Sequence, residues 1–161
     1  MKHEMVTRVE DITFRYPYHR EAVKELVSIF WEKEGVIALV FGGSVAKHME
    51  RPDSDIDAMV VVTDDFYAKA KEENCTAGMI PMGDCAYPGG YFDYKYMTKD
   101  FIRDAAEKAS EPTRNSFIGS HVMFSADPEV TELVSTTPVF QERESEDKML
   151  SFFSDLQLNY Q

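Results

Sequence analysis

The sequence predicts a small α/β domain in which a mixed β-sheet carries helices mainly on one of its faces. Two short apolar runs rich in valine, residues 36–41 and 58–62, have the length and composition of buried strands. An alternating aromatic segment, residues 91–97, suits a third strand. Segments with helical spacing lie between and around these runs, and that alternation is typical of the α/β class.

The N-terminal half is predicted to alternate between helix and strand. The first helix covers residues 20–34, because apolar side chains recur there at helical spacing and Gly35 is well placed to end it. The run at residues 36–41 is too short for a helix and has no polar position, so we expect a strand covered on both faces. A short helix over residues 44–50 and a second strand over residues 55–63 are expected to follow.

The C-terminal half is predicted to contain two more strands and four helices. Residues 75–90 are punctuated by glycine and proline, which indicates an irregular segment. Thr98 is a candidate helix cap, and Pro128 suits the first turn of a helix. The predicted elements are a helix from Asp64 or Asp65 to about residue 74, a strand at 91–97, a helix from 99, a strand at 120–125, a helix opened by 127–129 and a helix from 145 to the end.

Chain length and pattern predict one domain followed by a terminal helix. The 161 residues suit one compact domain and leave little room for a second. We assign residues 1–142 to that domain and residues 143–161 to a C-terminal helix, either a packing element or the start of a helical region. This helix has more apolar surface than one face should carry. It therefore packs on this domain, leads into a further helical domain, or contacts a second copy or another partner.

The charge balance narrows the classes of partner. The chain carries 29 acidic and 17 basic residues, a formal net charge of −12. A field of that sign repels nucleic acid and favours a cationic small molecule or a basic protein, although acidic surfaces also serve solubility. No apolar run approaches the length of a membrane span and no signal segment is visible, so we expect a cytoplasmic protein. In that reducing compartment Cys75 and Cys85 are expected to be free thiols.

The most informative motif is a glycine turn followed by two carboxylates. Gly42, Gly43 and Ser44 end the first apolar run, and Asp55 and Asp57 lie at the entry of the second. Residues i and i+2 of a strand point to the same face, so the two carboxylates would project side by side. They repel each other unless a proton or a cation lies between them. A glycine turn that opens a helix suits phosphate, so together the two elements predict a metal-bound phosphate.

A third carboxylate strengthens this interpretation. Asp93 lies within the aromatic strand, where a charge is costly unless it is exposed or partnered. If this strand is an edge that faces water, Asp93 is simply solvated; if it lies beside the strand of Asp57, the three carboxylates converge. Lys95 would then share the face of Asp93 and neutralise phosphate or carboxylate. Oxygen ligands on one face suit magnesium, which binds through a few carboxylates and shares substrate phosphates.

These residues resemble the signature of the nucleotidyltransferase superfamily typified by DNA polymerase β. That signature is an apolar strand ending in glycine and serine, a spacer of about this length, an Asp-apolar-Asp pair and a further aspartate on a later strand. The resemblance covers residues 36–97 and implies a nucleotidyltransferase-like fold. Small bacterial members commonly carry Arg-Ala-Arg-Gly after the serine. Residues 45–48 here are Val-Ala-Lys-His, so Lys47 keeps a positive charge and His48 replaces a glycine.

The resemblance implies a magnesium-dependent enzyme that transfers a nucleoside monophosphate from a nucleoside triphosphate to a hydroxyl and releases pyrophosphate. Asp55, Asp57 and Asp93 would be its catalytic residues and the ligands of two magnesium ions, and Asp93 would also accept the proton of the acceptor hydroxyl. The nucleotide, with ATP among the candidates, would be held by the glycine turn and two lysines: Gly42, Gly43, Ser44, Lys47 and Lys95.

Two classes of function remain open after the sequence is read. In the enzyme class, the sign of the charge favours a small cationic acceptor over a DNA or tRNA end. The alternative is a non-catalytic nucleotide-binding protein, or an antitoxin-like regulator on the same scaffold. The apolar C-terminal helix and the lack of an obvious acceptor-binding module favour this alternative.

Overall fold

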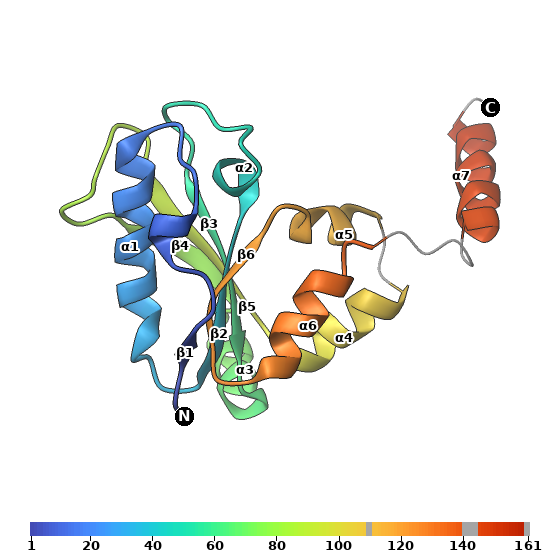
Figure 1. Ribbon diagram of the computed structural model, residues 1–161. Coiled ribbons are helices and arrows are strands. Elements are labelled where there is room, and N and C mark those ends of the chain that lie inside the picture. Colours follow the sequence, from blue (N-terminus) through green and yellow to red (C-terminus); the bar gives the residue numbers. More distant parts are fainter. Residues whose placement is uncertain (109–110, 140–144, 160–161) are drawn as a thin grey trace.

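The protein is described by a computed structural model over residues 1–108, 111–139 and 145–159. Its centre is a six-stranded sheet with the strand order β1-β6-β2-β3-β5-β4 (Figure 1). The strands β3 and β5 are parallel and the other neighbouring pairs are antiparallel, so the predicted mixed sheet is confirmed. The strands are β1 (Glu4–Met5), β2 (Val36–Gly42), β3 (Ile56–Val62), β4 (Ala77–Pro81), β5 (Tyr91–Met97) and β6 (His121–Ser125).

Helices cover both faces of this sheet, whereas the sequence predicted helices mainly on one (Figure 1). On one face Phe30 packs in a core with Phe41, and on the other Ile102 and Val130 pack in a second core with Val40. Neighbouring residues of a strand point to opposite faces, so the wholly apolar β2 needs a cover on each. The helices are α1 (Pro17–Trp31), α2 (Gly43–Ala46), α3 (Asp64–Glu72), α4 (Lys99–Lys108), α5 (Glu111–Phe117), α6 (Pro128–Thr136) and α7 (Ser145–Asn159), with a short 3₁₀ helix at Val9–Asp11.

Local capping signals explain where several helices begin. The Thr98 side chain accepts a hydrogen bond from the Phe101 amide at 3.2 Å, as expected of a cap at the start of α4. Asp127 caps α6, which has a proline in its first turn, as predicted. The cap of α3 differs from the prediction, because the residue with a capping side chain is Thr63 and Asp64 is already helical.

Three elements, β4, α5 and β1, have no clear local sequence signal and were not predicted. Strand β4 lies inside the segment predicted to be irregular, and it contains Gly78 and Pro81, two residue types that strands disfavour. Its antiparallel pairing with β5 decides its conformation. Because β4 covers one side of β5 and β3 covers the other, β5 is not an edge strand. Helix α5 and the two-residue strand β1 were also not predicted.

The C-terminal helix α7 stands apart from the sheet and from the other helices (Figure 1). The predicted boundary between residues 142 and 143 lies within residues 140–144, outside the described residues. Large apolar side chains of α7 are exposed, namely Met149, Leu150, Phe152, Phe153 and Leu156. The expectation that this helix carries an unusually large apolar surface is therefore confirmed.

Two other expectations concern thiols and membranes. Cys75 and Cys85 are free, as predicted. Across the described residues, none of the helices is both long enough and apolar enough to span a membrane.

The buried aromatic residue of β5 offers a test of this architecture. Phe92 is fully buried in the core beneath α1, so Phe92→Ala is expected to lower the free energy of unfolding by about 3–5 kcal/mol. Met79 on the neighbouring strand β4 is 71% exposed, so Met79→Ala should change it by no more than about 0.5 kcal/mol. Urea titration followed by circular dichroism measures both. Equal effects of the two substitutions would contradict the assigned packing of β5.

Candidate active site

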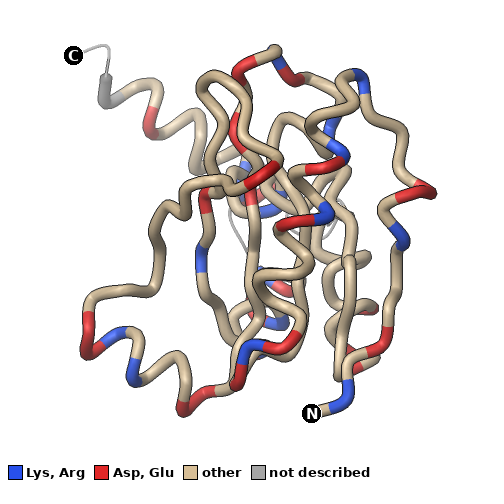
Figure 2. Tube along the Cα trace, turned by 90° about the vertical axis from the view of Figure 1, so that its left-hand side faces the viewer, with Lys and Arg blue, Asp and Glu red and all other residues tan. Residues whose placement is uncertain are grey.

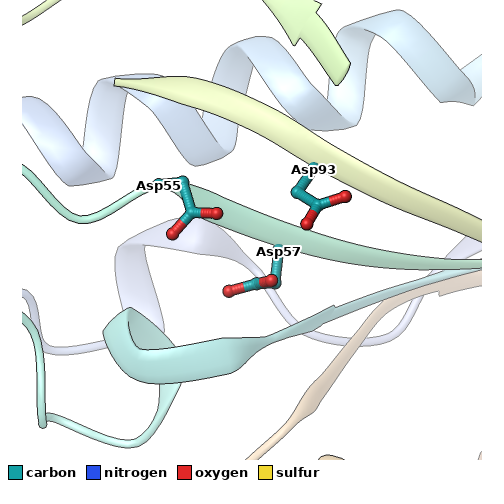
Figure 3. A group of neighbouring side chains, drawn as sticks. All are labelled: Asp55, Asp57 and Asp93. Carbon is teal, nitrogen blue, oxygen red and sulfur yellow. The ribbon is translucent and has the colours of Figure 1, made fainter. Parts of the chain in front are cut away.

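Three carboxylates meet at one end of β3 and β5. Asp55 lies immediately before β3, Asp57 is the second residue of that strand, and Asp93 lies on β5. The parallel register sets Asp57 directly beside Asp93. One oxygen from each of the three side chains lies within 4.8 Å of the others, and Figure 3 shows the carboxylates turned toward a common space. The convergence expected for adjacent strands is thus present.

The electrostatic consequence is concentrated at Asp57. Burial raises the pKa of its carboxyl to about 6, and the negative charges of Asp55 and Asp93 act in the same direction. The positive charges of Lys95 and Lys47 act in the opposite direction without cancelling the rise. The ionised form of Asp57 is therefore electrostatically unfavourable, and a bound proton or cation would stabilise this carboxyl group. This is the behaviour expected of a carboxylate cluster suited to a metal ion.

The glycine turn approaches Asp57 too closely for any other residue. Gly42 lies opposite Asp57 in the antiparallel register of β2 and β3. Gly43 has a φ of +75°, a left-handed conformation that favours glycine. A Cβ at this position would lie 1.8 Å from Oδ2 of Asp57. The backbone of the turn and the Asp57 carboxylate are therefore in direct contact, and Ser44 follows, half-buried, within α2.

Two lysines flank the carboxylates. Lys95 lies two residues after Asp93 on β5, so it shares the same face of the sheet, and its side chain is exposed. Lys47 follows α2, and its Nζ donates a hydrogen bond to the backbone oxygen of Asn115 in α5 at 2.7 Å. Both lysines are close enough to oppose the rise in the pKa of Asp57. The predicted phosphate-binding residues thus lie around one site, while Lys47 also links α2 to α5.

Tyrosines that the sequence analysis did not assign to the site support Asp55. The negative charge of the neighbouring Asp55 raises the pKa of the Tyr91 phenol. The hydroxyl of Tyr87 donates to the Ser54 backbone oxygen at 2.6 Å. The segment leading into Asp55 is therefore held by side chains from another part of the chain. The only sequence signal for this role was the density of aromatic residues near Asp93.

A comparison with known protein families identifies the family of this chain. The sequence profile of the nucleotidyltransferase domain matches residues 19–110, which include the glycine turn and all three carboxylates. The chain belongs to the nucleotidyltransferase domain family. The residues that the family profile matches contain the acidic cluster, and they form part of the α/β fold described above. Among curated proteins, no sequence matches this chain closely enough to count as a relative.

Two solved structures have similar backbones. A nucleotidyltransferase-like protein from Exiguobacterium sibiricum 255-15 is 11% identical, with a TM-score of 0.48, and the match covers 77% of this chain. This nucleotidyltransferase-domain chain spans only 40% of that protein's length. A toxin–antitoxin structure with AMP-PNP is 13% identical, with a TM-score of 0.40, and the match covers 85% of this chain and 97% of the other.

The contact between the turn and Asp57 can be tested by adding one methyl group. Gly43→Ala places a Cβ against the Asp57 carboxylate and strains a positive φ, so we expect about 1–2 kcal/mol of destabilisation and loss of divalent-cation binding. Gly119→Ala is the matched control. Its φ is +69°, but its Cβ would meet the flexible Lys47 side chain at 3.3 Å. Thermal unfolding and calorimetry with Mn²⁺ report the two effects. Normal cation binding by Gly43→Ala would contradict the assignment.

A second test uses the titration of Asp57. The pKa of Asp57 in the folded protein, about 6, lies above the ordinary aspartate value of 3.8. Between these two pH values the folded state therefore binds more protons than the unfolded state. In metal-free buffer this group should therefore lower stability as pH rises from about 4 to 6, by at most about 3 kcal/mol. Asp57→Asn should remove that loss and be as stable as the wild type or more stable at pH 7. Saturating Mg²⁺ should stabilise only the wild type.

This expectation differs in sign from that of a purely structural aspartate. If Asp57 stabilised the fold through hydrogen bonds to its carboxylate, Asp57→Asn would lower the melting temperature at pH 7. Denaturant titrations of both proteins at pH 4, 5, 6 and 7, with EDTA and then with Mg²⁺, separate the cases. A destabilised Asn variant that still gains stability from Mg²⁺ would rule out the metal-ligand role.

Proposed function

We propose that this chain is a magnesium-dependent nucleotidyltransferase that transfers a nucleoside monophosphate from a nucleoside triphosphate to a hydroxyl. The observation that carries the proposal is the convergence of three carboxylates beside a glycine turn in backbone contact with one of them. Membership of the nucleotidyltransferase domain family supports the same class of chemistry. The complete carboxylate cluster favours an enzyme over the non-catalytic or antitoxin-like alternative.

The donor set fits magnesium. Asp55, Asp57 and Asp93 supply oxygen ligands from one face, and the pKa of Asp57 is raised by burial and by the two neighbouring carboxylates, so a cation would stabilise its charged form. We assign these three residues to hold two magnesium ions. When bound, the ions would neutralise developing charge on the phosphates and on the attacking oxygen.

We assign the remaining roles to the groups around the carboxylates. The backbone amides of Gly43 and Ser44, with the turn at Gly42, hold the phosphates, while Lys47 and Lys95 supply positive charge. The acceptor oxygen forms a bond to the α-phosphorus as the bond to pyrophosphate breaks. Asp93 accepts the proton that the acceptor hydroxyl loses. The protein thus contributes position and charge, with no covalent intermediate.

The charge of the protein favours a small-molecule acceptor over a nucleic acid. The formal net charge is −12, and Figure 2 shows acidic residues spread along the whole trace among fewer basic ones. Such a field repels a phosphate backbone and attracts a cationic acceptor. The exposed apolar face of α7 further suggests contact with a second copy or another partner.

Pyrophosphate release tests the proposal directly. The wild-type protein is incubated with Mg²⁺ and each of ATP, GTP, CTP and UTP against a panel of hydroxylated acceptors. For the productive pair, Asp57→Asn and Asp93→Asn are each expected to lower the rate at least about 1,000-fold, because both remove charge that stabilises the transition state. Asp84→Asn, an exposed carboxylate in the loop before β5, should leave the rate within about 2-fold.

Two results would count against this function. If the folded wild-type protein binds none of the triphosphates in the presence of Mg²⁺, a nucleoside triphosphate is not its substrate. A rate that survives Asp57→Asn and Asp93→Asn would show that any transfer takes place elsewhere on the protein.

A further inference from the structure

A cavity of about 340 Å³ opens directly from the carboxylates. Asp57 and Asp93 lie on its border, and it extends along the sheet face that α4 and α5 cover. Its size lies at the lower end of the range for small-molecule pockets, and it is large enough for one nucleoside but not for a macromolecule. The cavity was not predicted from the sequence, because one of its walls belongs to α5, a helix that was not predicted.

Four of the residues that line this cavity have thioether or aromatic side chains. Met59 of β3 and Met97 of β5 come from the sheet, while Phe101 of α4 and Phe117 of α5 come from the helices opposite. Three of these side chains are buried or half-buried, and Phe101 is 49% exposed. Flat aromatic faces and polarizable sulfur atoms suit a planar ring system better than a flexible or charged chain. The walls therefore match a nucleobase.

The position of the cavity links it to the phosphate-binding residues. Gly43 and Lys47 line it together with the two carboxylates. Lys47 also donates to the backbone oxygen of Asn115, which joins the glycine turn to the cavity wall. A molecule with phosphates at the turn would thus have its covalently attached nucleoside at the cavity mouth.

We propose that this cavity binds the nucleobase and ribose of the triphosphate, with Phe101 as the principal stacking residue. The inference rests on the proposed function, because that function supplies the phosphates at the glycine turn. On this proposal, contacts with the base contribute to the affinity for the nucleotide in addition to the contacts with the phosphates. Met59 and Met97 then shape the opposite wall and contribute to the selection of the base.

Calorimetry with two probes separates base binding from phosphate binding. Magnesium with a non-hydrolysable ATP analogue reports on both parts, and magnesium with inorganic tripolyphosphate reports on the phosphates alone. The wild type should bind the analogue more tightly than tripolyphosphate. Phe101→Ala should weaken the analogue about 10-fold or more, because an aromatic stacking partner is lost, and should change tripolyphosphate less than 2-fold. Phe101→Tyr should restore the wild-type affinity.

Phe152→Ala is the matched control, since it removes another exposed phenylalanine, on α7, which stands apart from the sheet and from α4 and α5 (Figure 1). It should leave the affinity for both probes unchanged. Circular dichroism of each variant checks that the fold is retained, which the partial exposure of Phe101 favours.

Three outcomes would overturn the inference. Equal affinity of the wild type for the two probes would leave no role for the base. Equal weakening of both probes by Phe101→Ala would indicate a general disturbance of the site. Unchanged nucleotide binding by Phe101→Ala, with a raised KM for the acceptor, would assign the cavity to the acceptor instead. Failure of the proposed function is distinguishable, because the wild type would then bind neither probe.

Discussion

The parallel pairing of β3 with β5 is the interaction on which the candidate site depends. It sets Asp57 beside Asp93, while the antiparallel pairing of β3 with β2 sets Gly42 on the other side of Asp57. Side chains alternate between faces along a strand, so a slip of one residue would turn Asp93 into the apolar core that contains Phe30. The buried residues between these charges hold the register. The strand register that packs the core therefore also fixes the geometry of the site.

The site brings three carboxylates together, and their mutual repulsion does not stabilise the fold. Burial and two neighbouring carboxylates raise the pKa of Asp57, and the nearby lysines compensate only in part. Perturbation of this kind is common where a protein binds or transforms a ligand, because the ligand supplies the missing charge. Further along the same strand faces lie two apolar residues, Met59 two residues after Asp57 and Met97 four residues after Asp93. The period of two thus places a charged region and an apolar cavity side by side on one face of the sheet.

Much of the site could be predicted because its signals are local. The glycine turn, the aspartate pair and the unexpected charge of Asp93 each stand out within a few residues, and strand periodicity says which side chains share a face. Strand β4 was missed because Gly78 and Pro81 argue against a strand, and only pairing with β5 overrides that preference. The hydrogen bond from Tyr87 to the backbone before Asp55 was missed because it joins residues far apart in sequence. The same reason hid the contact of Lys47 with α5.

By itself, the sequence determined the α/β class, most of the helices and strands, and the residue types available for metal and phosphate. These properties depend on spacing along the chain, which is fully visible in one dimension. The tertiary structure alone decided the strand order, the cover on both faces of the sheet, the contact that requires glycine at position 43, and the cavity beneath α5. Each of these depends on which distant segments pack together, and packing is chosen by the total burial and pairing of the whole chain rather than by any local pattern.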